Sequence, residues 1–131
     1  MRLLSALTIC LLLVGPAQAK PGFPAAPDAG TVSYNRDIRP ILVKNCFGCH
    51  GDVKQLEGNV LLKTFADATG KTGFEPVIVP GEPQKSILVQ RVSASEPELR
   101  MPPQESEKQL SAREITLLEQ WVAAGAEYEQ H

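Results

Sequence analysis

Two cysteines separated by two residues, with a histidine directly after the second, constrain this chain more than any other feature. The segment reads Cys46-Phe47-Gly48-Cys49-His50. Two thiols at this spacing can add across the two vinyl groups of one haem, and the adjacent histidine is placed to bind the iron from the proximal side. The motif therefore predicts one haem c, attached covalently through Cys46 and Cys49, with His50 as an iron ligand.

Three other kinds of site use cysteines at such spacings. A zinc site needs about four Cys or His ligands, but only Cys10 and His131 remain outside the motif. A thioredoxin-like pair begins a helix that follows a strand, whereas the residues before Cys46 look helical and those after His50 look like loop. A disulfide closing so small a loop constrains the unfolded chain little and leaves the histidine unexplained. Haem attachment accounts for the whole segment.

Residues 1–19 have the features of a cleavable signal peptide. An apolar run at residues 3–14 follows a basic residue, and residues 17–19 form a small-x-small cleavage pattern. The run is too short to span a bilayer comfortably. We expect cleavage after Ala19, which leaves a mature chain of 112 residues (131 minus 19) beginning at Lys20. This predicts a periplasmic or otherwise secreted protein without stable membrane insertion, the alternative being an uncleaved N-terminal anchor.

The sixth ligand of the iron has two candidates in the mature chain. Met1 leaves with the signal peptide, so Met101 and the terminal His131 remain. Two prolines follow Met101, and they stiffen the loop that would hold its thioether. Core packing is the ordinary role of a lone methionine, but polar neighbours argue against it here. Because chain ends such as His131 usually fray, Met101 is the predicted ligand, with an open site or another donor as the alternative.

The first part of the mature chain predicts a linker and then a helix. Residues 20–30 are rich in proline and glycine and form a flexible lead, so the folded domain is expected to cover residues 31–131. Apolar residues at helical spacing predict a helix over residues 34–45. Pro40 suits a first helical turn, which makes Asp37 a candidate cap.

A second helix is predicted at the C-terminal end. Ser111 and Glu114 form a capping box before an apolar stripe, and Gly125 is placed to end the helix. Trp121 lies on the apolar face of this helix, so we interpret it as a core residue rather than an electron relay.

Signals between these two helices are weaker. Frequent glycines and prolines indicate long irregular loops over residues 70–81. Pro83 is well placed at the first position of a helix that runs to about Ser93. Within that helix we interpret Arg91 as an ordinary solvated charge.

These motifs resemble the planctomycete-type cytochrome c domain, a branch of the class I c-type cytochromes. The resemblance covers most of residues 32–128 and rests on residues 34–42, 45–51, 78–83, 86, 100–103, 118–122 and 125–126. It implies an all-α fold, with N- and C-terminal helices packed around one haem and long irregular loops, His50 and Met101 as axial ligands, and a place in a periplasmic electron-transfer system. Such domains commonly lead a much longer polypeptide, so the partner here is expected to be a separate protein.

Charge excludes one class of function and leaves the partner open. Of 13 basic side chains Arg2 is lost with the signal peptide, and the remaining 12 against 15 acidic ones give a net charge of −3. Nucleic-acid binding therefore has no support. Our hypothesis is a one-electron carrier, not an enzyme, whose partners are redox proteins. The alternatives are a haem subunit of a larger periplasmic dehydrogenase, and a haem enzyme or ligand-binding protein with an open sixth site.

Overall fold

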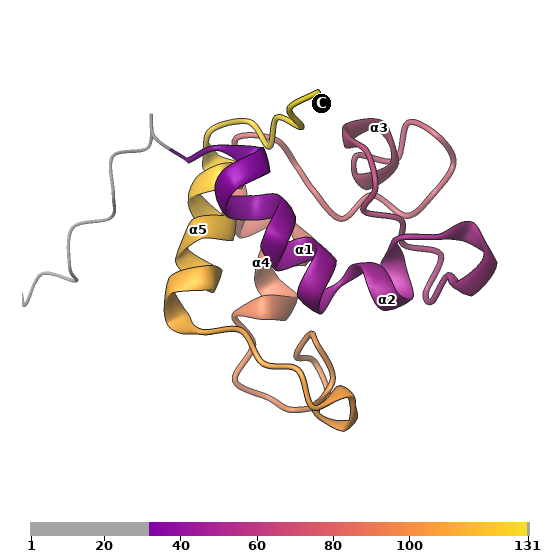
Figure 1. The fold of residues 1–131 in the computed structure, drawn as a ribbon, viewed down its shortest axis with the longest axis vertical. Coiled ribbons are helices and arrows are strands. Elements are labelled where there is room, and N and C mark those ends of the chain that lie inside the picture. The colour runs from indigo at the N-terminus through magenta and orange to yellow at the C-terminus, as the bar shows by residue number, and fades with distance from the viewer. Residues whose placement is uncertain (1–31, 131) are drawn as a thin grey trace, which may run out of the picture.

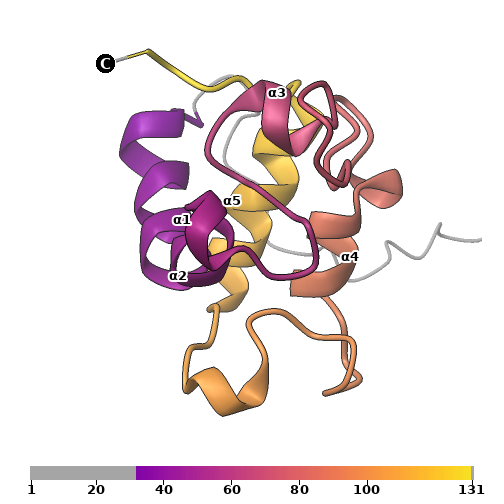
Figure 2. The ribbon, with the colours of Figure 1, turned by 90° about the vertical axis from the view of Figure 1, so that its right-hand side faces the viewer.

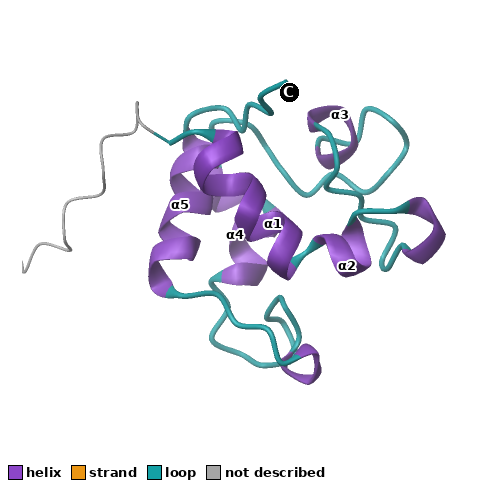
Figure 3. Cartoon of the chain, viewed as in Figure 1, coloured by secondary structure: helices purple, strands orange, loops and turns teal. Residues whose placement is uncertain are grey.

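The computed structural model describes residues 32–130, which form helices joined by long loops (Figure 1, Figure 3). These residues contain no strand, as the predicted all-α class requires. The predicted signal peptide, the flexible lead and His131 lie outside the described residues. In chain order the elements are η1 (Tyr34–Ile38), α1 (Arg39–Asn45), α2 (Phe47–His50), η2 (Val53–Gln55), α3 (Phe65–Ala68), η3 (Pro83–Lys85), α4 (Ile87–Val92), η4 (Gln104–Ser106) and α5 (Ala112–Ala123).

The first helix covers the predicted residues but has a different cap. A π-helical turn, η1, continues directly into α1, so residues 34–45 are helical throughout. The Ser33 hydroxyl accepts a hydrogen bond from the Arg36 N–H at 3.3 Å, and the Asp37 carboxylate accepts one from the Ser33 N–H at 2.9 Å. The prediction of Asp37 as the cap is therefore wrong, because Ser33 satisfies a free N–H of the first turn and Asp37 supports it from inside the helix.

The C-terminal helix α5 is confirmed with its predicted ends. The Ser111 hydroxyl accepts from the Glu114 N–H at 3.2 Å, and the Glu114 carboxylate accepts from the Ser111 N–H at 2.7 Å, which completes the capping box. Gly125 follows the helix with a φ of +107°, in the left-handed region that favours glycine. Trp121 is 3% exposed, as expected of a core residue. No helix within residues 32–130 has the length and apolarity needed to cross a membrane.

The predicted helix beginning at Pro83 is interrupted. Ser86 separates η3 from α4 and has an extended backbone, with φ −85° and ψ 118°. Its buried hydroxyl accepts from the Val79 N–H at 2.9 Å and donates to the Glu82 carbonyl at 3.0 Å. A serine side chain that bonds nearby backbone groups competes with helical hydrogen bonding. This competition explains why α4 begins only at Ile87.

Three aromatic side chains from η1, α5 and the residues after α5 form a cluster. The ring centroids of Tyr34 and Trp121 are 5.8 Å apart, those of Tyr34 and Tyr128 4.6 Å, and those of Trp121 and Tyr128 5.2 Å. Burial raises the pKa of Tyr128, so its hydroxyl stays protonated, and it donates to the Leu62 carbonyl at 3.1 Å. The residues after α5 are thereby joined to the middle of the chain.

Two segments outside the main helices carry the paired cysteines and the predicted methionine ligand. We call residues 46–62 the attachment segment and residues 94–110 the Met101 loop. α5 packs against η1 and α4, and Figure 2 shows the Met101 loop below these helices, at one end of the molecule. Figure 1 shows the attachment segment leaving the end of α1 in the opposite direction from α5. The helical core thus supports the attachment segment and the Met101 loop, which both leave it.

Candidate cofactor site

A cavity of about 570 Å³ brings together the four residues that the sequence predicts as cofactor ligands. Cys46, Cys49 and His50 lie on its wall, and so does Met101 from the other end of the domain. Cavities of this size with mainly apolar walls and a few polar groups are typical of sites for small molecules and cofactors. The apolar part of the wall comprises Val60, Leu62, Val77, Ile87, Leu88, Val92, Pro102 and Pro103.

Backbone hydrogen bonds fix the turn that carries both cysteines. The Cys46 N–H donates to the Leu42 carbonyl at 2.8 Å, and the Cys46 carbonyl accepts from the His50 N–H at 2.9 Å. Cys46 is 8% exposed and Cys49 is exposed, and both are free thiols. Burial raises the pKa of the Cys46 thiol to about 11, although the nearby Lys108 ammonium opposes this shift. Cys46 is therefore a neutral thiol at physiological pH.

The chain leaves this turn through a position that only glycine can occupy. A Cβ atom on Gly51 would lie 2.6 Å from the Phe47 carbonyl oxygen, closer than such atoms approach in proteins. Any larger residue would push the turn apart directly after His50. Gly51 therefore keeps α2 compact where it presents the histidine.

A backbone carbonyl sets the tautomer of His50. The His50 Nδ1 atom is 3.2 Å from the Val60 carbonyl oxygen, and the Leu62 N–H donates to the His50 carbonyl at 2.8 Å. Because a carbonyl oxygen can only accept, Nδ1 is the nitrogen that carries the hydrogen in the neutral ring, where the Nε2 lone pair is then available. Histidines that bind metals usually donate their other ring N–H to a carbonyl or carboxylate in this way. The His50 side chain is thus prepared for coordination through Nε2.

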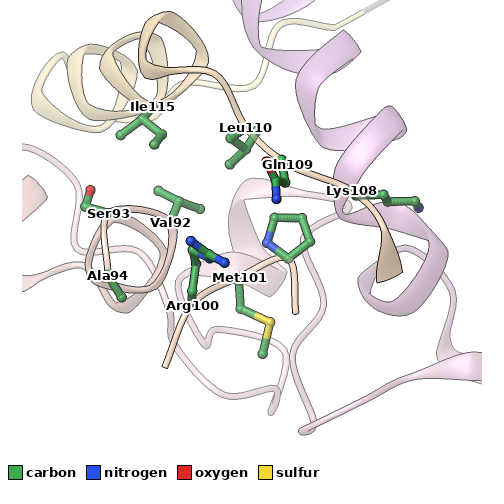
Figure 4. A pocket seen from close by; sticks show the side chains of 10 residues that line it. Val92, Ser93, Ala94, Arg100, Met101, Lys108, Gln109, Leu110 and Ile115 are labelled. Carbon is green, nitrogen blue, oxygen red and sulfur yellow. The ribbon is translucent and has the colours of Figure 1, made fainter. Parts of the chain in front are cut away.

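Met101 lies on a loop and is 40% exposed, which agrees with the prediction that it is not a core residue. Its N–H donates to the Arg91 carbonyl at 2.9 Å. Met101 also borders a second cavity, of about 180 Å³. Figure 4 shows its thioether directed away from Leu110 and Ile115, which line the far side of that smaller cavity. The sulfur atom is therefore not packed among these apolar side chains.

The residues present fit a haem attached by thioethers. Two free thiols, an imidazole with a free Nε2 and a partly exposed thioether share one largely apolar cavity. The competing interpretations fit less well. Among residues 32–130 no three His, Cys, Asp or Glu side chains come together as a metal-binding group, and the same residues lack the strand that a thioredoxin-like pair needs.

The two basic side chains on the wall of the larger cavity were not predicted as site residues. Arg91 lines the larger cavity, and its Nη1 donates to the Leu99 carbonyl at 3.1 Å, so its interpretation as an ordinary solvated charge is wrong. Lys108 lines the same cavity, and its Nζ lies 3.5 Å from where a Cβ atom on Gly48 would be. Both are common surface residue types in a sequence, and only the tertiary fold brings them to the cavity. The Val60 carbonyl could not be predicted either, because it contributes no side chain.

Comparison with protein families matches residues 46–105 to the family described as Planctomycete cytochrome C. Comparisons with curated proteins and with solved structures found no match. The matched residues begin at Cys46 and extend just beyond Met101. They contain all four residues predicted to bind the cofactor and exclude α1 and α5. Residues 46–105 therefore match the Planctomycete cytochrome C family, as the sequence resemblance predicted.

Proposed function

We propose that this protein is a one-electron carrier with a single haem c, held by Cys46 and Cys49 and ligated by His50 and Met101. The family that residues 46–105 match implies haem c with iron and an electron-transfer role. The observation that carries the finer proposal is that these four side chains share the wall of one cavity. When bound, haem supplies an iron that changes between its ferric and ferrous states by one electron.

Each of the four residues has a separate task in this proposal. The thiols of Cys46 and Cys49 would hold the haem through two C–S bonds, which addition of S–H across its two vinyl groups would give without a leaving group. His50 binds through Nε2, and the Val60 carbonyl keeps the ring in the required tautomer and raises its basicity. The Met101 thioether would be the second ligand of the iron, and such a ligand would raise the reduction potential. With His50 and Met101 both held by the iron, no site would remain on it for a substrate, which favours a carrier over an enzyme.

The proposed location is the periplasm or the cell exterior. It rests on the signal-peptide pattern of residues 1–19 and on the compartment in which haem is attached to such motifs. Intact-mass analysis of protein exported from a bacterial host should give a chain that begins at Lys20 and carries the mass of one haem. We expect separate redox proteins as partners. A stable complex that co-purifies with the chain would favour the dehydrogenase-subunit alternative.

One observation favours a second candidate, a haem protein that binds a small ligand. The cavity of about 180 Å³ borders Met101, whose side chain is 40% exposed (Figure 4). A thioether held in such surroundings has room to move away from the iron, which would leave an axial position for carbon monoxide or cyanide. The carrier and the ligand-binding protein therefore differ in how firmly Met101 stays bound.

Optical spectra of the holoprotein test the two candidates directly. The carrier should show the weak near-infrared charge-transfer band of an iron–sulfur bond in its ferric form, and it should bind carbon monoxide and cyanide slowly. Met101→Ala should lose the band, bind both ligands rapidly and have a lower reduction potential. Val43→Ala, at a side chain that is 49% exposed on α1, is the control and should behave as the wild type. Rapid carbon monoxide binding by the wild type, unchanged in Met101→Ala, would establish the ligand-binding candidate instead.

A further inference from the structure

The Met101 loop has few fixed connections to the rest of the molecule. Several of its hydrogen bonds are internal, such as those from the Leu99 and Arg100 N–H groups to the Glu96 carbonyl, both at 3.1 Å. Among the described residues, the hydrogen bonds that join the Met101 loop to other segments both involve Arg91. The position of this loop therefore depends strongly on one residue of α4.

Arg91 holds the loop on both sides of Arg100. Its carbonyl accepts from the Met101 N–H at 2.9 Å, and its guanidinium Nη1 donates to the Leu99 carbonyl at 3.1 Å. These two contacts bracket Arg100 on the loop. A hydrogen bond from a charged donor is stronger than one between neutral groups. The backbone on either side of Arg100 is thus fixed to a single point.

The point of attachment is itself rigid. Three residues of α4, Leu88, Val89 and Val92, are buried in the core. The Leu88 N–H also donates to the Val77 carbonyl at 2.9 Å, which joins α4 to the segment before it. Arg91 is the residue of this helix that combines a well-anchored backbone with a polar side chain on the cavity wall. A hydrogen bond to Arg91 therefore fixes the Met101 loop relative to the core.

We propose that Arg91 is the positioning residue for Met101: its guanidinium fastens the Leu99 carbonyl and so keeps the thioether at the cofactor cavity. This inference rests on the proposed role of Met101 as an axial ligand. A thioether is a weak ligand for iron, so the loop that carries it must not drift. Removing the guanidinium leaves only the backbone bond between Met101 and Arg91, which any side chain at position 91 can make.

The test compares holoprotein variants at two basic residues. Arg91→Leu keeps an apolar stem and removes the donor, and it should bind cyanide roughly 10- to 100-fold faster than the wild type, the factor expected for loss of a hydrogen bond to a charged group. Its near-infrared band should weaken and its reduction potential should fall. Lys85→Leu removes a positive charge from an exposed residue outside those that line the two cavities and should leave all three properties close to those of the wild type. Equal changes in both variants would show an effect of charge and overturn the proposal.

Amide hydrogen exchange separates the failure of this inference from the failure of the proposed function. In the wild type the Met101 amide should exchange more slowly than the Glu98 amide, and in Arg91→Leu this protection should decrease. The inference is overturned if the wild type has the near-infrared band and Arg91→Leu changes neither the band, the cyanide rate nor the exchange. That result leaves the ligand assignment intact. A wild type without the band overturns both. If Arg91→Leu does not fold, Arg91→Lys replaces it. Exchange of the wild-type Met101 amide as fast as that of the Glu98 amide also overturns the inference.

Discussion

The attachment segment and the Met101 loop contribute to the same cavity but are held by different kinds of contact. In the attachment segment, the Cys46 carbonyl accepts from the His50 N–H at 2.9 Å and the Cys49 carbonyl accepts from the Glu57 N–H at 3.2 Å. These bonds connect residues that are close in sequence. The Met101 loop instead relies on Arg91, which belongs to another element. The side proposed to bind the cofactor covalently is thus ordered mainly by local bonds, with one long-range bond from the Tyr128 hydroxyl to the Leu62 carbonyl. The side proposed to supply the reversible ligand is hydrogen-bonded to the rest of the molecule through Arg91 alone among the described residues.

The exposed fraction of apolar side chains also differs between the two segments. Leu62, at the end of the attachment segment, is 2% exposed, whereas Leu99 and Met101 in the loop are 49% and 40% exposed. Apolar burial is the main favourable contribution to folding. Cys46 and Leu62 therefore anchor the two ends of the attachment segment in the folded core, whereas the Met101 loop places less apolar surface there. A proposed axial ligand on such a loop can be changed with little cost to the fold.

The largest expected effect is the loss of covalent haem attachment, which depends on the cysteines and not on Met101. In the double variant Cys46→Ala with Cys49→Ala, no thioether can form, and denaturing electrophoresis should show no haem-stained band. Met101→Ala should keep a band of full intensity, because its task does not include attachment. Lys85→Ala, at an exposed residue paired with Glu82 at 2.6 Å, is the control and should also keep the band. Haem staining that survives denaturation of the double variant would exclude c-type attachment.

A pair of leucine substitutions measures the difference in packing. Leu62→Ala should lower the free energy of unfolding by about 2–5 kcal/mol, the range for removing a buried leucine side chain. Leu99→Ala removes the same atoms from an exposed position and should change it by less than about 0.5 kcal/mol. Urea unfolding of the two holoproteins provides the measurement. Similar losses for both variants would mean that the Met101 loop is packed as firmly as the attachment segment.

The same division separates the features that the sequence could predict from those that it could not. Contacts between residues near in sequence leave recognisable patterns, and the capping box of Ser111 with Glu114 and the helical end at Gly125 were predictable for that reason. The motif of Cys46, Cys49 and His50 is likewise local. Each of these features depends on spacings of a few residues, which helical geometry translates directly into contacts.

Other features could not be predicted, because they depend on the tertiary fold or on a choice between equally suitable local partners. The role of Arg91 arises from the approach of the Met101 loop to α4, and the Val60 carbonyl reaches His50 by main-chain atoms that no residue type announces. The break at Ser86 has a similar cause, because its hydroxyl bonds to the preceding loop. Asp37 was misassigned as a cap because Ser33 offered an equally suitable group slightly earlier. In all these cases the residue type permits several partners, and packing selects one.

The smallest expected effect concerns the point where the Met101 loop ends and α5 begins. Ser111→Ala removes the cap and should lower the free energy of unfolding by about 1 kcal/mol, whereas Ser111→Thr keeps a hydroxyl and should cost less. The cap also predicts a pH dependence. The Ser111 N–H and hydroxyl, both donating to the Glu114 carboxylate, hold the pKa of Glu114 below its usual 4.5. Because the pKa is lower in the folded state, this carboxylate stabilises the fold above about pH 4.5, and its contribution is lost as the pH falls through the folded value. Glu114→Gln should therefore be less stable than the wild type at neutral pH and approach it in acid. A stability difference of equal size at both pH values would show that the ionised Glu114 has no part in fixing this end of the loop.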